Sequence, residues 1–453
     1  MRKASRDAWT ASLYDRGHDH RDWGFISVLQ RQYRVLGYHW LDTVMAMAVF
    51  LLPAIALVAP TGYSWGASLL LIGAVTVFFT RRSLRQAWQP LPLGLKILIG
   101  FMLAYAAIWI GDAAWRGEGV REFDRPSRFL FAALCLVALS QCRLSQAWLW
   151  AGLCVGGIVT GYVAVWQKFI EGMTRASGTA QTIQFGNIAM MIGLMCLAGL
   201  IWAGAQRHRK LWISLLLIGA MGGVLASFLS GTRGAWLAPL AALPIGLWAA
   251  ARLGHKKRIC VLLPLVVVIF YMSIYFIPET GVKSRVDTAA AEVRDYFVND
   301  DRGGSVGYRF EMWRGGWILF SESPVIGWGE NAYIERLRAL GEEGVIAKGA
   351  SRFTHGHNEW INVLAKRGMV GGLILFGVYL APLIWFARHG RAQAGQLVHS
   401  NRLGLAVAGM LLPASFFVGG LTQVGFNHNS GAMMYAFMLA VLAGLSAQTD
   451  YAK

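Results

Sequence analysis

The sequence predicts an all-α protein that crosses a membrane many times. Three observations support this class: 56% of the 453 residues are hydrophobic, only 15% are charged, and long apolar runs recur along the whole chain. Soluble globular proteins carry about 25% charged residues, so a body of this size with so few charges cannot be wetted over its whole surface. The excess apolar area is expected to face lipid, which excludes a cytosolic enzyme, a disordered scaffold and a secreted disulfide-bonded module.

About twelve runs are long and apolar enough to be membrane-spanning helices. Crossing the hydrocarbon core takes roughly 20 residues of α-helix. The runs lie near 41–59, 63–79, 97–111, 129–141, 147–167, 186–204, 211–229, 235–251, 259–277, 369–387, 403–424 and 430–447. The run at 129–141 is the shortest of them.

Lysine and arginine clusters predict the orientation of these helices. They occur in the N-terminal tail and in the loops that contain Arg81-Arg82, Arg207 to Lys210, Arg252 to Arg258, and Arg388 to Arg402. With twelve spans every cluster falls on one side, and the positive-inside rule assigns that side, with both termini, to the cytoplasm. The formal net charge of +18 is then explained by cytoplasmic loops lying against anionic lipid, rather than by nucleic acid binding.

The predicted organisation has five parts. They are a cytoplasmic N-terminal tail (1–40), nine transmembrane helices (41–277), a large extracytoplasmic loop with short helices (278–356), the start of an extracytoplasmic helix followed by three transmembrane helices (357–447), and a cytoplasmic C-terminal tail (448–453). A loop this long among short hairpins is generally functional.

Two segments of the long loop have an amphipathic pattern. GYRFEMWRGGWILF (307–320) and ERLRALGEEG (335–344) are therefore expected to form short helices. Arg336, Arg338 and Arg352 of this loop are best explained as anchors in the lipid headgroups or as ion pairs with loop carboxylates.

Motifs for nucleotide-driven chemistry are absent from the sequence. There is no GxxxxGK[ST] and no D-x-D pair, and the five cysteines lie in or beside apolar runs without a CxxC pair. These absences argue against ATP-driven work, a nucleotide-sugar donor, a structural zinc site and a disulfide framework.

Cations are instead expected to gather on the extracytoplasmic side. Arg233 lies in SGTRGAW at the turn between two apolar runs, and Arg309 and Arg314 lie in YRFEMWRGGW. An arginine at membrane depth is costly unless it is paired or binds a ligand, and a guanidinium matches phosphate oxygens in a bidentate manner. The alternative is an anchor in the lipid headgroups, or an ion pair with a loop carboxylate such as Glu311.

A histidine candidate for proton transfer lies where the long loop meets the next helix. In THGHNEW, His357 has the chemistry to accept a proton from an attacking hydroxyl. A helix-capping or interfacial role is its alternative. His355 with His357 could form a two-ligand metal pair, but no third ligand at persuasive spacing appears. His428 in FNHNSG is a second, weaker candidate.

Four other polar residues are candidates for substrate contact. Asn358 could orient the imidazole or the acceptor, and Lys366 and Arg367 follow two to three helical turns later. Asn187 in FGNIAMM lies at the outer end of a predicted helix, where it either joins helices through its amide or contacts a polar headgroup.

These residues, in their order along the chain, resemble the bacterial O-antigen ligase/polymerase superfamily, particularly the O-antigen ligases. Four signatures carry the resemblance: Arg233 in S-x-T-R-G-A-W, Arg309 followed by Trp313, Pro324 with Gly327 and Gly329 in SPVIGWGENAY, and the H-[NSQ]-x9-G pattern matched by His357, Asn358 and Gly368. The resemblance covers about residues 180–375, and the earlier helices match only in hydropathy.

The resemblance implies a helical bundle of the lipid-carrier glycosyltransferase (GT-C-like) type, in the bacterial inner membrane with a periplasmic active site. The implied donor is polysaccharide on undecaprenyl pyrophosphate, and the implied acceptor is a sugar hydroxyl of lipid A–core. By resemblance His357 is the catalytic residue and Arg233 and Arg309 hold the pyrophosphate, without a metal or cofactor.

Two alternatives remain open at this stage. A polymerase or a protein O-oligosaccharyltransferase of the same superfamily shares the arginine and histidine pattern. A transporter of lipid-linked glycan would be expected to carry charges through the middle of several spans, whereas the predicted spans are nearly free of charge.

Overall fold

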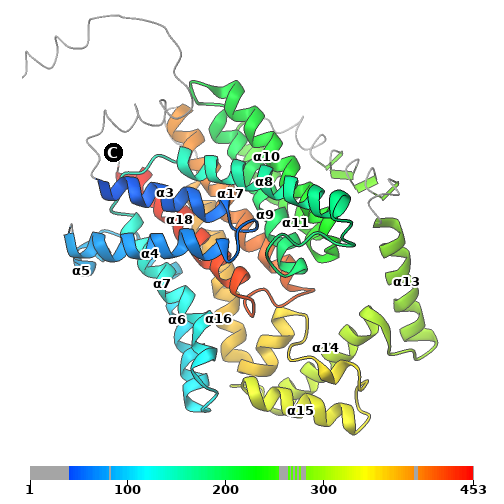
Figure 1. Ribbon diagram of the computed structural model, residues 1–453. Helices are drawn as coiled ribbons and strands as arrows, with labels where there is room; N and C mark the ends of the chain where they lie inside the picture. Colours follow the sequence, from blue (N-terminus) through cyan, green and yellow to red (C-terminus); the bar gives the residue numbers. More distant parts are fainter. Residues whose placement is uncertain are drawn as a thin grey trace, which may run out of the picture. The chain divides into compact units, whose positions relative to one another are not determined.

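A computed structural model describes residues 40–80, 83–254, 282–391 and 396–451, together with isolated positions between 264 and 276 (Figure 1). These residues form helices joined by turns, with no strand among them. The described residues from Trp40 onward belong to one compact unit. The predicted N-terminal tail and most of the predicted span 259–277 lie outside the described residues.

The first half of the chain is a succession of helices. Their bounds are α3 (Trp40–Ala54), α4 (Gly62–Thr80), α5 (Leu84–Trp88), α6 (Leu93–Trp115), η1 (Val120–Phe123), α7 (Asp124–Leu139), α8 (Ala147–Val165) with η2 (Trp166–Ile170), α9 (Thr182–Ala203), α10 (Arg209–Ser230), η3 (Arg233–Leu237) and α11 (Ala238–Arg252).

The second half contains the long loop and the last three long helices. Their bounds are α13 (Val282–Val298), α14 (Gly304–Glu322), α15 (Glu330–Glu342), η5 (Ala350–Arg352), α16 (Glu359–His389), α17 (Gln396–Gly420) and α18 (Asn429–Tyr451).

Nine helices in the described part of the chain are long and apolar enough to cross a membrane. This confirms the all-α polytopic class, whereas the count of twelve is not confirmed. Helix α3 is apolar but has only 15 residues. Helix α7 coincides with the predicted run at 129–141, but its 16 residues extend only about 24 Å.

Burial separates the central helices from the peripheral ones. The apolar window of α18 is completely buried, whereas only 33% of the window of α6 is buried. Large apolar side chains such as Ile72, Phe79 and Leu93 are exposed on the outer helices. Contiguous exposed apolar surface is unfavourable in water and natural in lipid, so this pattern agrees with a multi-pass membrane protein.

Small residues allow α8 and α10 to approach closely. A Cβ added at Gly157 would lie 2.2 Å from the carbonyl oxygen of Gly219, and one added at Gly222 would lie 2.3 Å from that of Gly157. Close backbone contact between small residues is a common way for helices to associate in membranes. This contact positions the end of α10, from which the arginine cluster described below begins.

The long loop folds into helices that pack against α16. As predicted, α14 covers 307–320, and α15 covers most of 335–344. A small apolar core joins Leu319 of α14, Leu337 of α15 and Ala365 of α16. Figure 1 shows α14 and α15 beside the first turns of α16. The loop therefore forms a folded cap rather than an open connection.

Candidate functional site

Three arginines meet at the turn that follows α10. Gly231 ends the helix in the left-handed region, with φ +64°. The Nε of Arg175 donates to the carbonyl oxygen of Ser230 at 2.7 Å, and the Nη1 of Arg285 donates to that of Gly231 at 3.4 Å. Nη1 of Arg233 in turn donates to the carbonyl oxygen of Arg285 at 3.1 Å. We call Arg175, Arg233 and Arg285, with Arg309, the arginine cluster.

The charges of this cluster are not neutralised by acids. Burial, followed by the charges of Arg285 and Arg233, lowers the pKa of Arg175. Burial and the charge of Arg233 lower the pKa of Arg285. Within the described part of the chain, no carboxylate oxygen lies within the 4.0 Å ion-pair distance of these guanidinium groups. Such a concentration of unneutralised cations is an anion-binding arrangement.

Arg309 extends the cluster from the long loop. It lies on α14, and its pKa is lowered first by burial and then by the charge of Arg233, with Glu292 acting in the opposite direction. The structure therefore brings the two arginines predicted from the sequence close together. Glu311, the carboxylate considered as their alternative partner, instead lies 3.9 Å from Arg302 and 3.9 Å from Arg314.

His357 lies next to this cluster in a strained turn. Its φ is +45°, in the left-handed region that non-glycine residues rarely adopt. Burial lowers the pKa of His357; the hydrogen bond to Gln423 opposes this and the charge of Arg309 adds to it. His357 is therefore neutral at pH 7, which is the form that can accept a proton.

A glutamine connects His357 to a second histidine. The Nδ1 of His357 lies 2.7 Å from Oε1 of Gln423, and Nε2 of Gln423 lies 3.3 Å from Nε2 of His428. Because an amide oxygen only accepts, Nδ1 of His357 carries the hydrogen, and its Nε2 has the free lone pair. Burial, followed by the charges of Arg125 and His357, lowers the pKa of His428, which suits a neutral acceptor of the Gln423 amide hydrogen.

Side chains from α14 and α16 hold the turn that contains His357. The Nε1 of Trp313 donates to the carbonyl oxygen of Gly356 at 3.0 Å, and Nζ of Lys366 donates to that of Thr354 at 3.0 Å. The side-chain oxygen of Asn362 accepts from the backbone nitrogen of Gly356 at 3.4 Å. These contacts from two elements fix the strained conformation of the turn.

The neighbouring histidine has a different environment. The rings of His355 and His357 are 4.4 Å apart. Burial, followed by the charges of His357 and Lys366, lowers the pKa of His355 to about 3. Over the described residues, no group of three His, Cys, Asp or Glu side chains that could hold a metal ion is found.

Two glycines, Gly327 and Gly368, allow the break in α16 that follows this turn. Gly368 has φ 60° and ψ −161°, which separates a short first segment of α16 from the rest. A Cβ there would lie 2.2 Å from the carbonyl oxygen of Val325, and one on Gly327 would lie 2.4 Å from the carbonyl carbon of Lys366. Backbone hydrogen bonds between 324–329 and 365–370, such as that from Met369 N to the Pro324 oxygen at 2.7 Å, close the contact.

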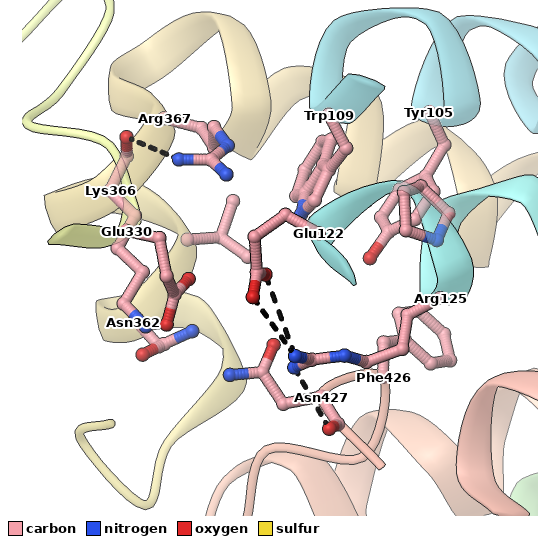
Figure 2. A pocket seen from close by; sticks show the side chains of 12 residues that line it. Tyr105, Trp109, Glu122, Arg125, Glu330, Asn362, Lys366, Arg367, Phe426 and Asn427 are labelled. Atoms are coloured by element: carbon pink, nitrogen blue, oxygen red, sulfur yellow. Dashed lines mark hydrogen bonds and ion pairs between the residues drawn. The ribbon is translucent and has the colours of Figure 1, made fainter. Parts of the chain in front are cut away.

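Three of the predicted site residues have partners inside the protein. Asn358 caps α16 through its side-chain oxygen, which accepts from the backbone nitrogens of Trp360 and Ile361. The Nζ of Lys366 lies 2.5 Å from Oε1 of Glu330. Arg367, only 4% exposed, lies 2.8 Å from Oδ2 of Asp112. Figure 2 shows Lys366, Arg367 and Glu330 where they line a pocket.

The other two predicted contacts lie near the edge of the site. Arg314 is 47% exposed and points toward Glu311. Asn187 lies on α9 beside Gly419 of α17, and its side-chain oxygen is buried with no hydrogen-bond partner in the described region. Arg175, Arg285 and Gln423 were not among the predicted site residues. Of these three, only Arg175 could have been suspected from the sequence. It lies in a loop on the predicted extracytoplasmic side, where few cations are clustered.

Fold and site together define a class: an all-α, multi-pass membrane protein with an anion-binding arginine cluster beside a neutral histidine. Residues 222–376 match the family model described as O-antigen ligase. The match includes Arg233, Arg309 and His357, and it supports an O-antigen ligase-like protein, as the sequence motifs predicted. At the coarse level, this supports an enzyme of the glycosyltransferase-like ligases and polymerases that act on lipid-linked glycans.

The chain is also similar to an uncharacterized protein of Haemophilus influenzae. The two sequences are 24% identical over 387 residues, which is 84% of this chain and 92% of the relative. The similarity thus extends beyond the O-antigen ligase match into the earlier helices.

Proposed function

We propose that the protein is an O-antigen ligase, which transfers a polysaccharide from undecaprenyl pyrophosphate to a sugar hydroxyl of lipid A–core. The observation that carries this proposal is the adjacency of a neutral imidazole to the arginine cluster. Trp313, one turn after Arg309 on α14, donates to the carbonyl oxygen of Gly356, the residue before His357, at 3.0 Å. The imidazole can accept the proton of an alcohol, and the cluster can neutralise a departing diphosphate.

The arginine cluster would bind the pyrophosphate of the donor. The negative charge on the pyrophosphate grows as the bond to the sugar breaks, so fixed cations stabilise the transition state more than the ground state. Arg233 and Arg309 come from two different elements, the turn after α10 and helix α14. Side chains from two elements would thus bind one pyrophosphate. Neutralising its charge would then need no metal or cofactor.

His357 would act as the general base. Its Nε2 takes the proton of the acceptor hydroxyl while the oxygen forms a bond to the anomeric carbon. The bond between that carbon and the pyrophosphate oxygen breaks, and undecaprenyl pyrophosphate leaves with the electron pair. Attack opposite to the leaving group inverts the anomeric configuration, and the imidazolium then releases its proton to solvent.

Gln423 would keep His357 in the productive tautomer. Its oxygen at 2.7 Å from Nδ1 directs the free lone pair of the ring to Nε2. A glutamine does this without adding charge, so it opposes the lowering of the pKa of His357 less than a carboxylate would.

In this proposal the site lies on the periplasmic face of the bacterial inner membrane, with both termini in the cytoplasm. The arginine and lysine clusters of the sequence favour this orientation through the positive-inside rule. Lipid-linked donor and lipid A–core would both reach the site within the outer leaflet.

Reconstituted transfer tests the proposal. Purified protein in lipid nanodiscs is given lipid-linked glycan and, separately, lipid A–core, free glycan or peptide, and products are resolved by gel shift. We expect transfer to lipid A–core, with His357→Ala reducing the rate by about 10²- to 10⁴-fold. The control is His208→Ala, at an exposed position before α10.

The acceptor distinguishes the alternatives. Transfer to free glycan alone would identify a polymerase, and transfer to peptide alone would identify a protein O-oligosaccharyltransferase. An unchanged rate in folded His357→Ala protein would contradict the role of the histidine.

A further inference from the structure

The connection between α17 and α18 carries Gln423, the residue that contacts the proposed base. This connection covers residues 421–428, and Gln423 is only 1% exposed within it. The oxygen of Gln423 fixes the tautomer of His357 only while it stays within hydrogen-bond distance of Nδ1. The tautomer of the base therefore depends on what holds this connection in place.

The two residues after the proposed base bind the connection on either side of Gln423. The side-chain nitrogen of Asn358 donates to the carbonyl oxygen of Leu421 at 3.2 Å. The Oε2 of Glu359 accepts from the backbone nitrogen of Phe426 at 3.1 Å. Together with the histidine, three consecutive side chains thus contact one connection.

Glu359 is buried for the sake of this contact. It is 1% exposed, and a carboxylate is rarely buried so completely without a partner. Among the residues that the structure describes, no lysine, arginine or histidine nitrogen lies within the 4.0 Å ion-pair distance of its oxygens. Its hydrogen-bond partner is the backbone of the connection.

Two glycines give the Glu359 side chain its place. A Cβ added at Gly420, the last residue of α17, would lie 3.2 Å from the Cβ of Glu359. A Cβ added at Gly425 would lie 3.6 Å from its Oε2. The side chain therefore contacts the connection at its start as well as near its end, and it can set the position of the residues between them.

Asn358 is less suited to a test, because it has two roles. Its oxygen caps α16 by accepting from the backbone nitrogens of Trp360 and Ile361, while its nitrogen binds the connection. Glu359 reaches the connection through a different side-chain hydrogen bond, so it can be changed without removing this cap.

We propose that Glu359 is a positioning residue for the transfer reaction, which holds the connection 421–428 so that the oxygen of Gln423 stays on Nδ1 of His357. This inference rests on the proposed function, since it concerns the base of that reaction. Glu359 acts through Gln423 and not on the substrate. Its loss allows the ring to adopt the other tautomer, in which Nε2 carries the hydrogen and cannot accept a proton.

The tautomer of His357 tests the inference without any transfer reaction. Nitrogen-15 NMR of histidine-labelled protein in lipid nanodiscs at pH 7 distinguishes a ring nitrogen that carries a hydrogen from one that does not. The signals that disappear in His357→Ala assign the residue. Glu359→Leu keeps a similar volume but accepts no hydrogen bond, so we expect a mixture of the two tautomers. Glu359→Gln retains an acceptor oxygen and should keep the wild-type tautomer.

A matched control separates this role from a general loss of stability. Tyr435→Phe also removes one buried hydrogen bond, from the Tyr435 hydroxyl to the carbonyl oxygen of Val378 at 2.7 Å, and it should leave the tautomer unchanged. If Glu359→Leu does not fold, Glu359→Asp replaces it, because its carboxylate is drawn back by one methylene group. The same mixture of tautomers is expected.

A double-mutant cycle tests whether Glu359 acts through Gln423. Glu359→Leu should lower kcat by about tenfold, with the KM values for donor and acceptor unchanged. In the Gln423→Leu background, Glu359→Leu should lower kcat no further, within about twofold. Residues that act through one contact are not additive, whereas independent structural defects are.

Failure of this inference is distinct from failure of the proposed function. A change of tautomer in the variants that weaken the contact supports the positioning role even if no acceptor is glycosylated. A wild-type tautomer in folded Glu359→Leu or Glu359→Asp protein would overturn it, and so would a loss of kcat that adds to that of Gln423→Leu.

Discussion

The Nδ1 of His357 lies 2.7 Å from Oε1 of Gln423. This single contact joins two segments that are 66 residues apart and leaves Nε2 of the histidine as the only basic ring nitrogen. The tautomer of the proposed base therefore depends on this pair.

The pH dependence of transfer should reflect the lowered pKa of His357. Burial and the charge of Arg309 lower the pKa of His357 below 6.5. The base must be neutral, so kcat/KM should hold down to a lower pH than it would for a histidine of ordinary pKa, and then fall. Arg309→Gln removes a positive charge, raises the pKa of His357 and should move the acidic limb of the profile to higher pH. Arg314→Gln is the control, and an identical limb in Arg309→Gln would rule out this coupling.

Changing Gln423 should alter the profile in a defined way. Gln423→Glu places a carboxylate against Nδ1, which raises the pKa of His357 and should shift the acidic limb upward while retaining activity. Gln423→Leu leaves Nδ1–H unpaired at a cost of about 1–3 kcal/mol and should slow transfer by about 10- to 100-fold. Rates are measured with saturating donor and acceptor. Gln206→Glu, far along the chain, should match the wild type; a profile unchanged in Gln423→Glu would show that the contact does not influence the base.

The arginine cluster should require guanidinium geometry as well as charge. Arg233→Lys keeps the charge but loses the bidentate donors, so we expect the KM for the lipid-linked donor to rise, or kcat to fall, by about 10- to 100-fold. Arg285→Gln should have a similar effect, because it joins the same turn. Arg294→Gln, on the exposed side of α13, serves as the control. Full activity in Arg233→Lys would indicate that Arg233 is only an anchor in the lipid headgroups.

Transfer is expected to proceed without a divalent metal ion. The charge that a metal supplies elsewhere is available from four guanidinium groups. Activity in excess chelator should equal activity in added magnesium, measured on the same preparation. Loss of transfer that only added metal restores would instead implicate His355 and His357 as ligands.

The glycine contact at the break in α16 should be essential for stability. Gly368→Ala places a Cβ at a residue with φ 60°, 2.2 Å from the carbonyl oxygen of Val325. We expect a loss of about 2–4 kcal/mol, seen as a lower midpoint of thermal unfolding in detergent. Gly100→Ala, where nothing lies within 4 Å of the added Cβ, should unfold like the wild type. Equal midpoints for the two variants would contradict the close contact.

Local patterns predicted the helices well. The amphipathic repeat of 307–320 depends only on spacing within one segment, and the structure has α14 there. Most apolar runs likewise coincide with helices, because burial in lipid is a property of each run. The run at 129–141 is less clear, since α7 is a helix whose length falls short of a span.

Some site residues could be found from local sequence motifs, whereas others join the site only through contacts between distant segments. Arg233 and Arg309 were recognisable from their motifs, but Arg285 has no motif and joins them only through the packing of α13 against the turn after α10. Lys366 and Arg367 carry a positive charge like the arginines of the cluster, so the sequence alone does not distinguish them. In the structure their charges are taken up by Glu330 and Asp112, so as substrate contacts they stay predictions.

The sequence by itself determined the membrane class and the kinds of chemistry available, because hydropathy and side-chain type are properties of single residues and segments. Only the tertiary structure decided which cations keep their charge free and which are neutralised. Ion pairing depends on distances of a few ångströms between segments that lie far apart in the chain, as Arg367 and Asp112 do, and no local pattern encodes those distances.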